Sequence, residues 1–305
     1  MARVPGRPGL SVTISGLSRI FGHDLGALLE LAGAADSLGV DQLVMPDHVV
    51  IGPNLDAYPF GTFPYPPEEP WLEPLTTLAA VAGATHHMRL STGVLVAPLR
   101  PAVLLAKTVS TLDVLSGGRV DLGVGVGWQP EEFAALGAPF EGRGGVLEDT
   151  VAACRALWTE APPVSFSSAT VSFEDLWCEP RPVQERLPVW FGGAGSARTA
   201  RRVATLGDGW LPVAGTPHAE LEEGISLIRA ACEEIGREPA TIGVRAGLPL
   251  AVNDAGHPEL EQALAAADHL GQLGVTAVSV TAARAATTLA EAISLLEELT
   301  SAWST

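Results

Sequence analysis

Residues 120–127 read "VDLGVGVG", an apolar run with glycine at three alternate positions, Gly123, Gly125 and Gly127. The run predicts a buried strand, yet glycine offers no side chain to pack and weakens a strand interior. Glycine inside a strand usually marks a bulge or a place where a ligand or another backbone comes close. Trp128 and an acidic helix start follow at once. This order favours the floor of a ligand site over tight helix-on-strand packing alone.

Outward from this strand, the chain repeats a unit made of an amphipathic helix, a Leu-Gly junction and an apolar strand. The unit recurs in "LELAGAADSLGVDQLVM", "ARRVATLGDGWLPV" and "LAAADHLGQLGVTAVSV", where the helices are expected to end at Gly39, Gly207 and Gly274. In the first unit, helical spacing predicts one apolar face formed by Leu25, Leu28, Leu29, Ala32, Ala35 and Leu38. Helices that alternate with buried strands imply a parallel sheet with helical crossovers.

The strand pattern predicts the fold class. The predicted strands lie at residues 10–14, 42–45, 90–96, 120–126, 189–192, 209–213, 243–251 and 277–280. Strands and helices alternating in this way over 305 residues predict an α/β fold, a closed (β/α)8 TIM barrel, as a single domain over residues 1–305. An open doubly wound sheet is the alternative, but "SVTISGLSRIFGHD" is a poor match to its Gly-rich first turn.

Two stretches interrupt the repeat. The first is Pro-rich, residues 51–70, and is expected to form a loop over the mouth of the barrel because its prolines block both helix and central strand. The second, residues 162–188, precedes the fifth strand and alternates like a hairpin laid over the barrel. Neither shows a boundary that would make it a separate domain.

Composition narrows the function. The chain is 47% hydrophobic and 17% charged, as expected of a globular protein. No apolar run reaches the roughly 18 residues of a membrane span, and the start lacks a long apolar core, so we expect a cytoplasmic protein. A net charge of −17 argues against a nucleic-acid partner and favours a small-molecule ligand. Three scattered cysteines, and histidines without metal-ligand spacing, indicate neither a disulfide framework nor a metal site.

Candidate site residues follow the predicted strands, because chemistry in such barrels lies at the C-terminal strand ends. Asp47 and His48 follow the second strand, although a structural loop histidine is the commoner case. The fifth strand runs into "GGAGSARTARR", residues 192–202, whose helix start directs free N–H groups and a positive dipole end toward one place. With three arginines in this stretch, it is a candidate anion site, and a solvated turn is the alternative.

Four stretches together resemble a known family: "LDVLSGGRVDLGVGVGWQPEEFAALG", "PDHV", "CEPRPVQERLPVWFGGAGS" and "LGDGWLP". They are similar to the luciferase-like flavin and deazaflavin oxidoreductases of the bacterial-luciferase superfamily, and most of all to the branch that uses the deazaflavin coenzyme F420. The resemblance covers nearly the whole chain and keeps the order of the motifs. It implies the same barrel, with an insertion near the fifth strand, and a homodimer.

The resemblance also implies a cofactor site at the mouth of the barrel. A bulge with a non-proline cis peptide, matching Gly93 and Val94, would back the ring, while Gly123 and Gly125 would serve barrel packing. The other cofactor residues implied are Asp47, Val126 and Gly127 at the ring, and Ala194, Gly195, Ala197 and Arg198 at the phosphate.

Two residues are assigned to chemistry and substrate. His48 matches a histidine near the reacting carbon, and an imidazole can exchange the proton that accompanies hydride transfer because it titrates close to neutral pH. Trp128 stands where the sugar-phosphate dehydrogenases of the family carry a glutamate proton donor. We therefore expect Trp128 to form an apolar substrate wall instead.

Three functions remain open on the sequence. F420 performs hydride transfer only, whereas reduced flavin mononucleotide (FMN) would permit monooxygenation with O2. The branch resemblance favours F420, as do Arg198, Arg201 and Arg202, which could meet the acidic tail of that coenzyme. FMN is the alternative cofactor. A non-catalytic flavin-binding barrel, or one whose pocket is filled by side chains, is the third possibility.

Overall fold

The computed structural model describes residues 6–253 and 258–304. Its main sheet is a closed parallel barrel, because β1 pairs with both β2 and β11, and β3 pairs with β5. Around the barrel the strands are β1 (Gly9–Thr13), β2 (Gln42–Met45), β3 (Arg89–Thr92) with β4 (Leu95–Val96), β5 (Val120–Gly125), β8 (Val189–Gly192), β9 (Gly209–Leu211), β10 (Gly243–Gly247) and β11 (Ala277–Thr281). The predicted (β/α)8 TIM barrel is confirmed.

The predicted strands are all present, but four of them are shorter or broken, including the one predicted at 120–126, where β5 ends at Gly125. The segment 90–96 is split into β3 and β4 at the Gly93–Val94 peptide, which is cis. Strand β9 ends at Leu211 and β10 at Gly247. Pro212 and Pro249 follow these two ends, and proline has no backbone N–H to continue a ladder.

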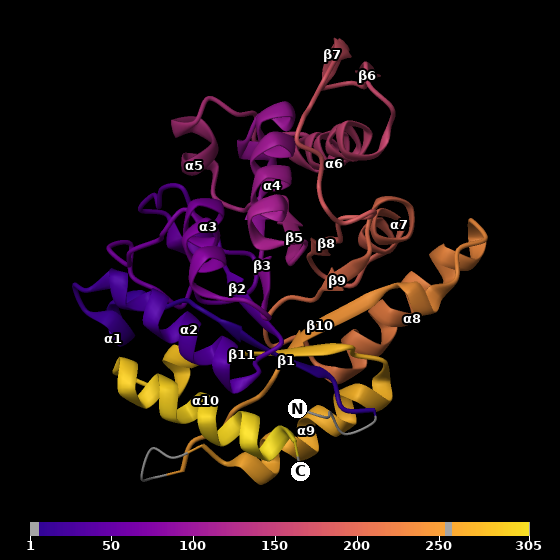
Figure 1. Cartoon of the computed structure of the whole chain (residues 1–305). Helices are drawn as coiled ribbons and strands as arrows, with labels where there is room; N and C mark the ends of the chain where they lie inside the picture. The colour runs from indigo at the N-terminus through magenta and orange to yellow at the C-terminus, as the bar shows by residue number, and fades with distance from the viewer. Residues whose placement is uncertain (1–5, 254–257, 305) are drawn as a thin grey trace.

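Helices surround the barrel (Figure 1). In chain order they are α1 (Leu17–Phe21), α2 (Leu28–Leu38), α3 (Pro74–Ala84), α4 (Ala102–Ser116), α5 (Pro130–Ala135), α6 (Arg143–Thr159), α7 (Ala197–Leu206), α8 (His218–Glu234), α9 (Leu260–Leu273) and α10 (Leu289–Trp303). Helices α2, α7 and α9 stop at the predicted glycines 39, 207 and 274.

The predicted apolar face of α2 is partly wrong. The α-helix begins only at Leu28, after a 3-10 turn over Leu25–Ala27. Its buried face carries Leu28, Leu31, Ala32 and Ala35, whereas Leu29 is 38% exposed on the flank. The spacing i, i+3, i+4, i+7 from Leu28 therefore describes the face, and a pattern that starts at Leu25 does not.

The insertion before β8 is a hairpin, as predicted. Strands β6 (Val164–Ser167) and β7 (Ser172–Leu176) pair antiparallel. The hairpin does not lie over the barrel: it projects beyond α6 at the top of the view in Figure 1, and β7 is largely exposed. It therefore takes no part in the mouth of the barrel.

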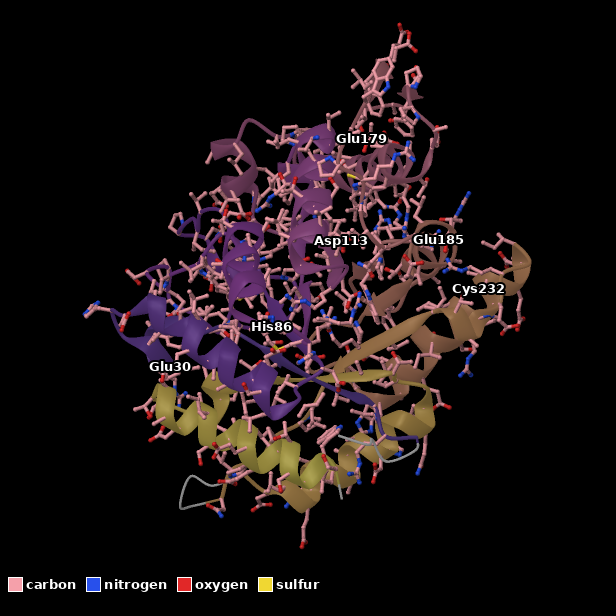
Figure 2. All side chains as sticks on the ribbon, viewed as in Figure 1. Glu30, His86, Asp113, Glu179, Glu185 and Cys232 are labelled. Carbon is pink, nitrogen blue, oxygen red and sulfur yellow. The ribbon has the colours of Figure 1, made fainter. Side chains whose placement is uncertain are left out.

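Acidic side chains lie on the surface and, like Asp113, in the interior (Figure 2). Glu30, Glu179 and Glu185 are exposed on the outside, whereas Cys232 is buried in α8 (Figure 2). Cys154 and Cys178 are buried free thiols as well.

Among the described residues, no helix is long and apolar enough to cross a membrane, and no three His, Cys, Asp or Glu side chains are grouped to hold a metal ion.

Candidate active site

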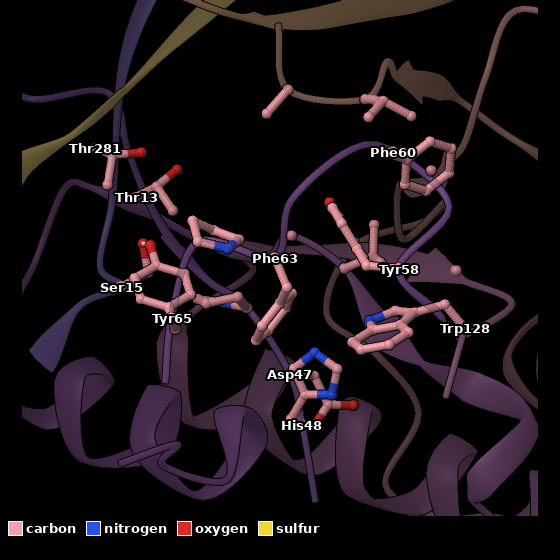
Figure 3. Close-up of a pocket in the computed structure, with 18 of the residues that line it drawn as sticks. Thr13, Ser15, Asp47, His48, Tyr58, Phe60, Phe63, Tyr65, Trp128 and Thr281 are labelled. Carbon is pink, nitrogen blue, oxygen red and sulfur yellow. Dashed lines mark hydrogen bonds between the residues drawn. The ribbon is translucent and has the colours of Figure 1, made fainter. Parts of the chain in front are cut away.

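A cavity of about 1370 Å³ opens at the C-terminal ends of the strands. This exceeds the roughly 300–1,000 Å³ of a typical small-molecule site, so it can hold more than one ligand group. Its wall combines residues of the strand ends with the aromatic side chains of the Pro-rich loop, such as Tyr58, Phe60 and Phe63 (Figure 3). The loop thus covers the mouth of the barrel, as predicted.

The glycines of β5 make room for neighbouring chain segments. A Cβ at Gly123 would collide with the carbonyl oxygen of Thr92, and one at Gly125 would lie 2.5 Å from Val94 Cγ2. The expected role in barrel packing is confirmed for both. Gly127 has a φ of +72°, and a Cβ there would lie 2.6 Å from Val96 Cγ1. Glycine is therefore required at position 127 by backbone conformation and packing, whatever lies in the cavity.

The Gly93–Val94 bulge forms part of the cavity wall. The cis peptide expected there is present. A Cβ at Gly192 would lie 2.5 Å from Val94 Cγ1, so the Val94 side chain fills the space that Gly125 and Gly192 leave open. A Cβ at Gly93 would collide with Val44. The bulge is therefore packed from several sides and presents a fixed surface to the cavity, which Val126 and Gly127 continue.

A buried cation lies beneath this bulge. The guanidinium of Arg245, on β10, is 5% exposed, donates to Gln42 Oε1 and lies 2.9 Å from Ser91 Oγ. Burial lowers the pKa of Arg245 to about 10, so the group still carries its charge at neutral pH. A buried positive charge therefore lies under the floor of the cavity, close enough to the buried carboxylate of Asp121 to interact with it.

His48 is held in a buried contact with an acidic residue. It is 8% exposed, and its Nδ1 lies 3.3 Å from Oε2 of Glu132, a residue in the first turn of α5 with no exposed surface. The edges and faces of Phe63, Trp71 and Trp128 surround the imidazole, with ring centroids 5.7, 4.8 and 5.8 Å away. The ring is therefore fixed in a largely apolar enclosure at the cavity wall (Figure 3).

Asp47 lies beside His48, but its carboxylate is engaged elsewhere. One oxygen accepts from Arg100 Nη1 at 2.6 Å and from Val96 N at 2.8 Å, and the other accepts from Arg100 Nη2 at 3.0 Å. The Asp47 side chain is fully buried. Burial opposes the charge on Arg100, but the contacts with Asp47 outweigh it and raise the pKa of Arg100. The pair fixes the loop after β2 to β4.

The Pro-rich loop is fastened at both ends. Near its start, the backbone of Gly52 both donates to and accepts from the side-chain amide of Gln129, at 2.8 and 3.1 Å. Near its end, Tyr65 Oη donates to Ser15 Oγ at 2.7 Å. Tyr58 packs on Trp128 at 5.2 Å, and burial raises the pKa of the Tyr58 phenol, which is therefore neutral. An aromatic roof is thus held over His48.

The predicted phosphate residues lie at the rim, outside this enclosure. The cavity lining extends to Gly192 and Gly193, and Ala194, Gly195, Ala197 and Arg198 follow it as exposed residues. Ser196 caps α7, with its side chain accepting from Thr199 N. Of the three arginines expected to meet an anionic tail, Arg202 already pairs with Glu148 at 2.6 Å, and a contact of the three with a tail stays a prediction.

Gly195 has a packing role. A Cβ at this position would lie 2.9 Å from the Cα of Gly224 in α8 and 3.4 Å from Trp210. It would point into the contact between α7 and α8, which is not the direction of the cavity. The absence of a side chain at 195 is therefore explained by helix packing.

With the geometry in place, comparison with known proteins identifies the family. Residues 4–288 match the family model of the luciferase-like monooxygenases. The chain belongs to this family. An F420-dependent secondary alcohol dehydrogenase, solved with an F420-acetone adduct, superposes with a TM-score of 0.74 at 18% identity, covering 97% of this chain and 99% of that one.

Relatives known by sequence match over shorter stretches. An uncharacterised protein of Mycobacterium tuberculosis is 34% identical over 168 residues, which are 55% of this chain and 58% of that protein. The FMNH2-dependent dimethylsulfone monooxygenase of Pseudomonas putida is 32% identical over 177 residues, 57% of this chain and 48% of that protein. The matched stretch therefore spans about half the length of each of these two curated relatives.

Sequence reasoning missed several residues of this luciferase-like site. Glu132 stood in the acidic helix start after Trp128 without an assigned role, and Arg245 is a lone charge in the apolar strand "GVRAG". A charge in a buried strand is a signal that could have been used. Nothing in the sequence pairs Glu132 with His48, or Trp71 with either. The aromatic residues of the loop were expected to lie over the mouth, without individual roles.

Proposed function

We propose that this luciferase-like protein is an F420-dependent oxidoreductase that transfers a hydride between the deazaflavin and a small, partly apolar organic substrate. The observation that carries the proposal is the shared cavity wall of His48 and the Gly93–Val94 bulge, with about 1370 Å³ of space in front of them. A cavity of this size also argues against a barrel filled by its own side chains.

The residues present fit a flat ring with a charged tail. The Gly93–Val94 bulge, Val126 and Gly127 would form the surface on which the ring lies, and Asp47 would hold the bulge in place through Val96 N. Ala194, Gly195, Ala197 and Arg198 would meet the phosphate at the start of α7. Bound F420 would supply the hydride acceptor or donor carbon.

His48 and Trp128 would act on the substrate. The imidazole can take a proton from a substrate hydroxyl, or give one to a carbonyl oxygen, as the hydride moves. Trp128, together with Phe63 and Trp71, would exclude water and offer apolar contacts. The site therefore favours a substrate with one polar oxygen on an apolar body.

The charges that line the cavity favour an anionic cofactor. Arg19, Arg143, Arg245 and Arg284 line it, in a chain whose net charge is −17. Among the described residues, the lining carboxylates are Asp47 and Glu69, which accept hydrogen bonds from Arg100 and Ser18. The acidic tail of F420 suits such a mouth better than a neutral ligand would. The F420-bound neighbour supports the same choice.

A second candidate is an FMN-dependent monooxygenase that uses reduced flavin and O2. The identity with the FMNH2-dependent enzyme of Pseudomonas putida supports it, and the ring surface and phosphate rim would serve FMN in the same way. For either cofactor we propose a single-domain homodimer, which light scattering in solution tests.

Anaerobic titration of the purified chain with oxidised and reduced F420, and with oxidised and reduced FMN, tests the proposal. We expect F420 to bind at least roughly tenfold more tightly than FMN, which corresponds to about 1.4 kcal/mol. Tighter binding of reduced FMN, with O2 consumption on mixing, would select the monooxygenase. No binding of any of the four would contradict both.

A further inference from the structure

Glu132 contacts His48, and the proposed function assigns it no role. Its carboxylate is fully buried and contacts two consecutive residues, His48 and Val49. Oε1 accepts from the backbone N–H of Val49 at 2.6 Å, and Oε2 lies 3.3 Å from Nδ1 of His48. Each oxygen of the carboxylate thus has a partner of its own.

This arrangement bears on which ring nitrogen carries the proton. An ionised carboxylate only accepts hydrogen bonds, so beside an ionised Glu132 the Nδ1 of His48 would be the donor. A neutral imidazole has one N–H, which leaves Nε2 as a bare acceptor. Nε2 has no hydrogen-bond partner within residues 6–253 and 258–304, and Figure 3 shows the far ring nitrogen directed toward the space between Phe63 and Trp128. The free lone pair therefore faces the cavity.

We propose that Glu132 is a positioning residue that fixes His48 in the Nδ1–H tautomer and so presents Nε2 to the substrate as the proton acceptor. The role of that proton rests on the proposed function, whereas the tautomer itself does not. Neutral histidine has two tautomers, and the partner of one nitrogen selects the state of the other. In Ser-His-Asp hydrolases, exchanging the carboxylate beside the histidine for an amide gives the wrong tautomer and lowers turnover by about 10⁴-fold.

A glutamine at position 132 separates positioning from a merely structural role. The Val49 N–H needs an acceptor, so the amide oxygen of Glu132→Gln would stay on it. The NH2 group would then face Nδ1 of His48 and donate to it. Nδ1 would have to become the acceptor, and the proton would move to Nε2. If Glu132 served the loop alone, through Val49, the amide oxygen would keep that contact and the tautomer would stay unchanged.

The experiment is nitrogen NMR of the full chain with ¹⁵N-labelled histidine, read through long-range proton–nitrogen correlations. Spectra are recorded over a pH series that extends above about 8.5, roughly two units above the ordinary imidazole value of about 6.5, and the tautomer is read where the ring nitrogen shifts no longer change with pH. The His48 signals are assigned by their loss in His48→Gln. The control is Glu131→Gln, because Glu131 lies in the same helical turn and makes no hydrogen bond to His48 within the described residues.

We expect the Nδ1–H tautomer in the parent and in Glu131→Gln, and the Nε2–H tautomer in Glu132→Gln. A parent protein in which Nε2–H is the main form overturns the inference without any variant, so a failure of Glu132→Gln to fold leaves the test intact. A folded Glu132→Gln with unchanged tautomer overturns it as well. Failure here with tight F420 binding would leave the proposed function standing, and the expected tautomers without cofactor binding would refute the function alone.

Discussion

The two ends of the proposed cofactor site are built in different ways. Around His48, buried side chains from several segments contact one another, and the imidazole is enclosed by Glu132 and three aromatic rings. At the rim, one continuous segment, residues 194–198, offers exposed backbone and one arginine. We infer that the inner end carries the reacting side chain and the rigid structure around it. The rim, in contrast, contributes to the free energy of cofactor binding through charged and backbone groups that solvent screens. Substitutions at the two ends should differ accordingly.

The largest effect is expected on stability, at Asp47. Asp47→Ala would leave Arg100 largely buried beside the exposed Glu73 and would remove the acceptor of Val96 N–H, which costs about 3 kcal/mol of unfolding free energy. Urea denaturation measures it. The control, Glu73→Gln, removes the charge of the exposed partner of the same arginine but keeps an oxygen that can accept from Thr76 N at the start of α3, and it should cost less than about 1 kcal/mol. Equal losses for the two variants would show that the inner end is not the fixed element described here.

The next largest effect is expected on turnover, at His48. His48→Ala should lower turnover by roughly 10²-fold or more and change cofactor affinity by only a few-fold, because a positioned acid–base group is lost while the ring surface remains. Steady-state kinetics with an accepted substrate, and the titration above, measure the two. His86→Ala is the control, since His86 is exposed and outside the cavity. Unchanged turnover would reduce His48 to a neighbour of the ring.

A smaller effect is expected at Gly195, and it tests whether the rim glycine serves packing or phosphate. Gly195→Ala would place a Cβ 2.9 Å from the backbone of Gly224, and we expect a loss of about 1–3 kcal/mol in stability. Gly145→Ala is the control, because a Cβ there meets nothing within 4 Å. If Gly195→Ala is as stable as the parent but binds cofactor more weakly, close approach of a phosphate explains the glycine instead.

The smallest effect is expected at Arg198. Arg198→Ala should weaken cofactor binding by a few-fold at low ionic strength and by less at physiological salt, where the screening length falls to about 8 Å. Titrations at two salt concentrations measure this dependence. Arg201→Ala, on the same helix, controls for the general loss of one charge. Equal effects of both variants would mean that Arg198 acts through the field of the helix and makes no specific contact.

The same difference between the two ends explains what the sequence could predict. The barrel, the strand positions and the Gly93–Val94 bulge depend on local patterns and ordered motifs, and the structure confirms them. Contacts between distant residues were not predictable: Glu132 is 84 residues from His48, and Arg100 is 53 residues from Asp47. The packing of Gly195 on α8 belongs to the same class, because its partner, Gly224, lies in another helix.

The central claim is that a flat cofactor lies on the Gly93–Val94 bulge with its reacting carbon next to His48. A crystal structure of the chain with F420 tests this most directly, through the distance from the His48 imidazole to an oxygen-bearing substrate analogue at the deazaflavin ring. The account predicts the ring on Val94, the phosphate at the start of α7, and Nε2 within hydrogen-bond reach, about 2.6–3.2 Å, of that oxygen. A ring bound elsewhere in the cavity, or an oxygen that faces away from His48, would contradict it.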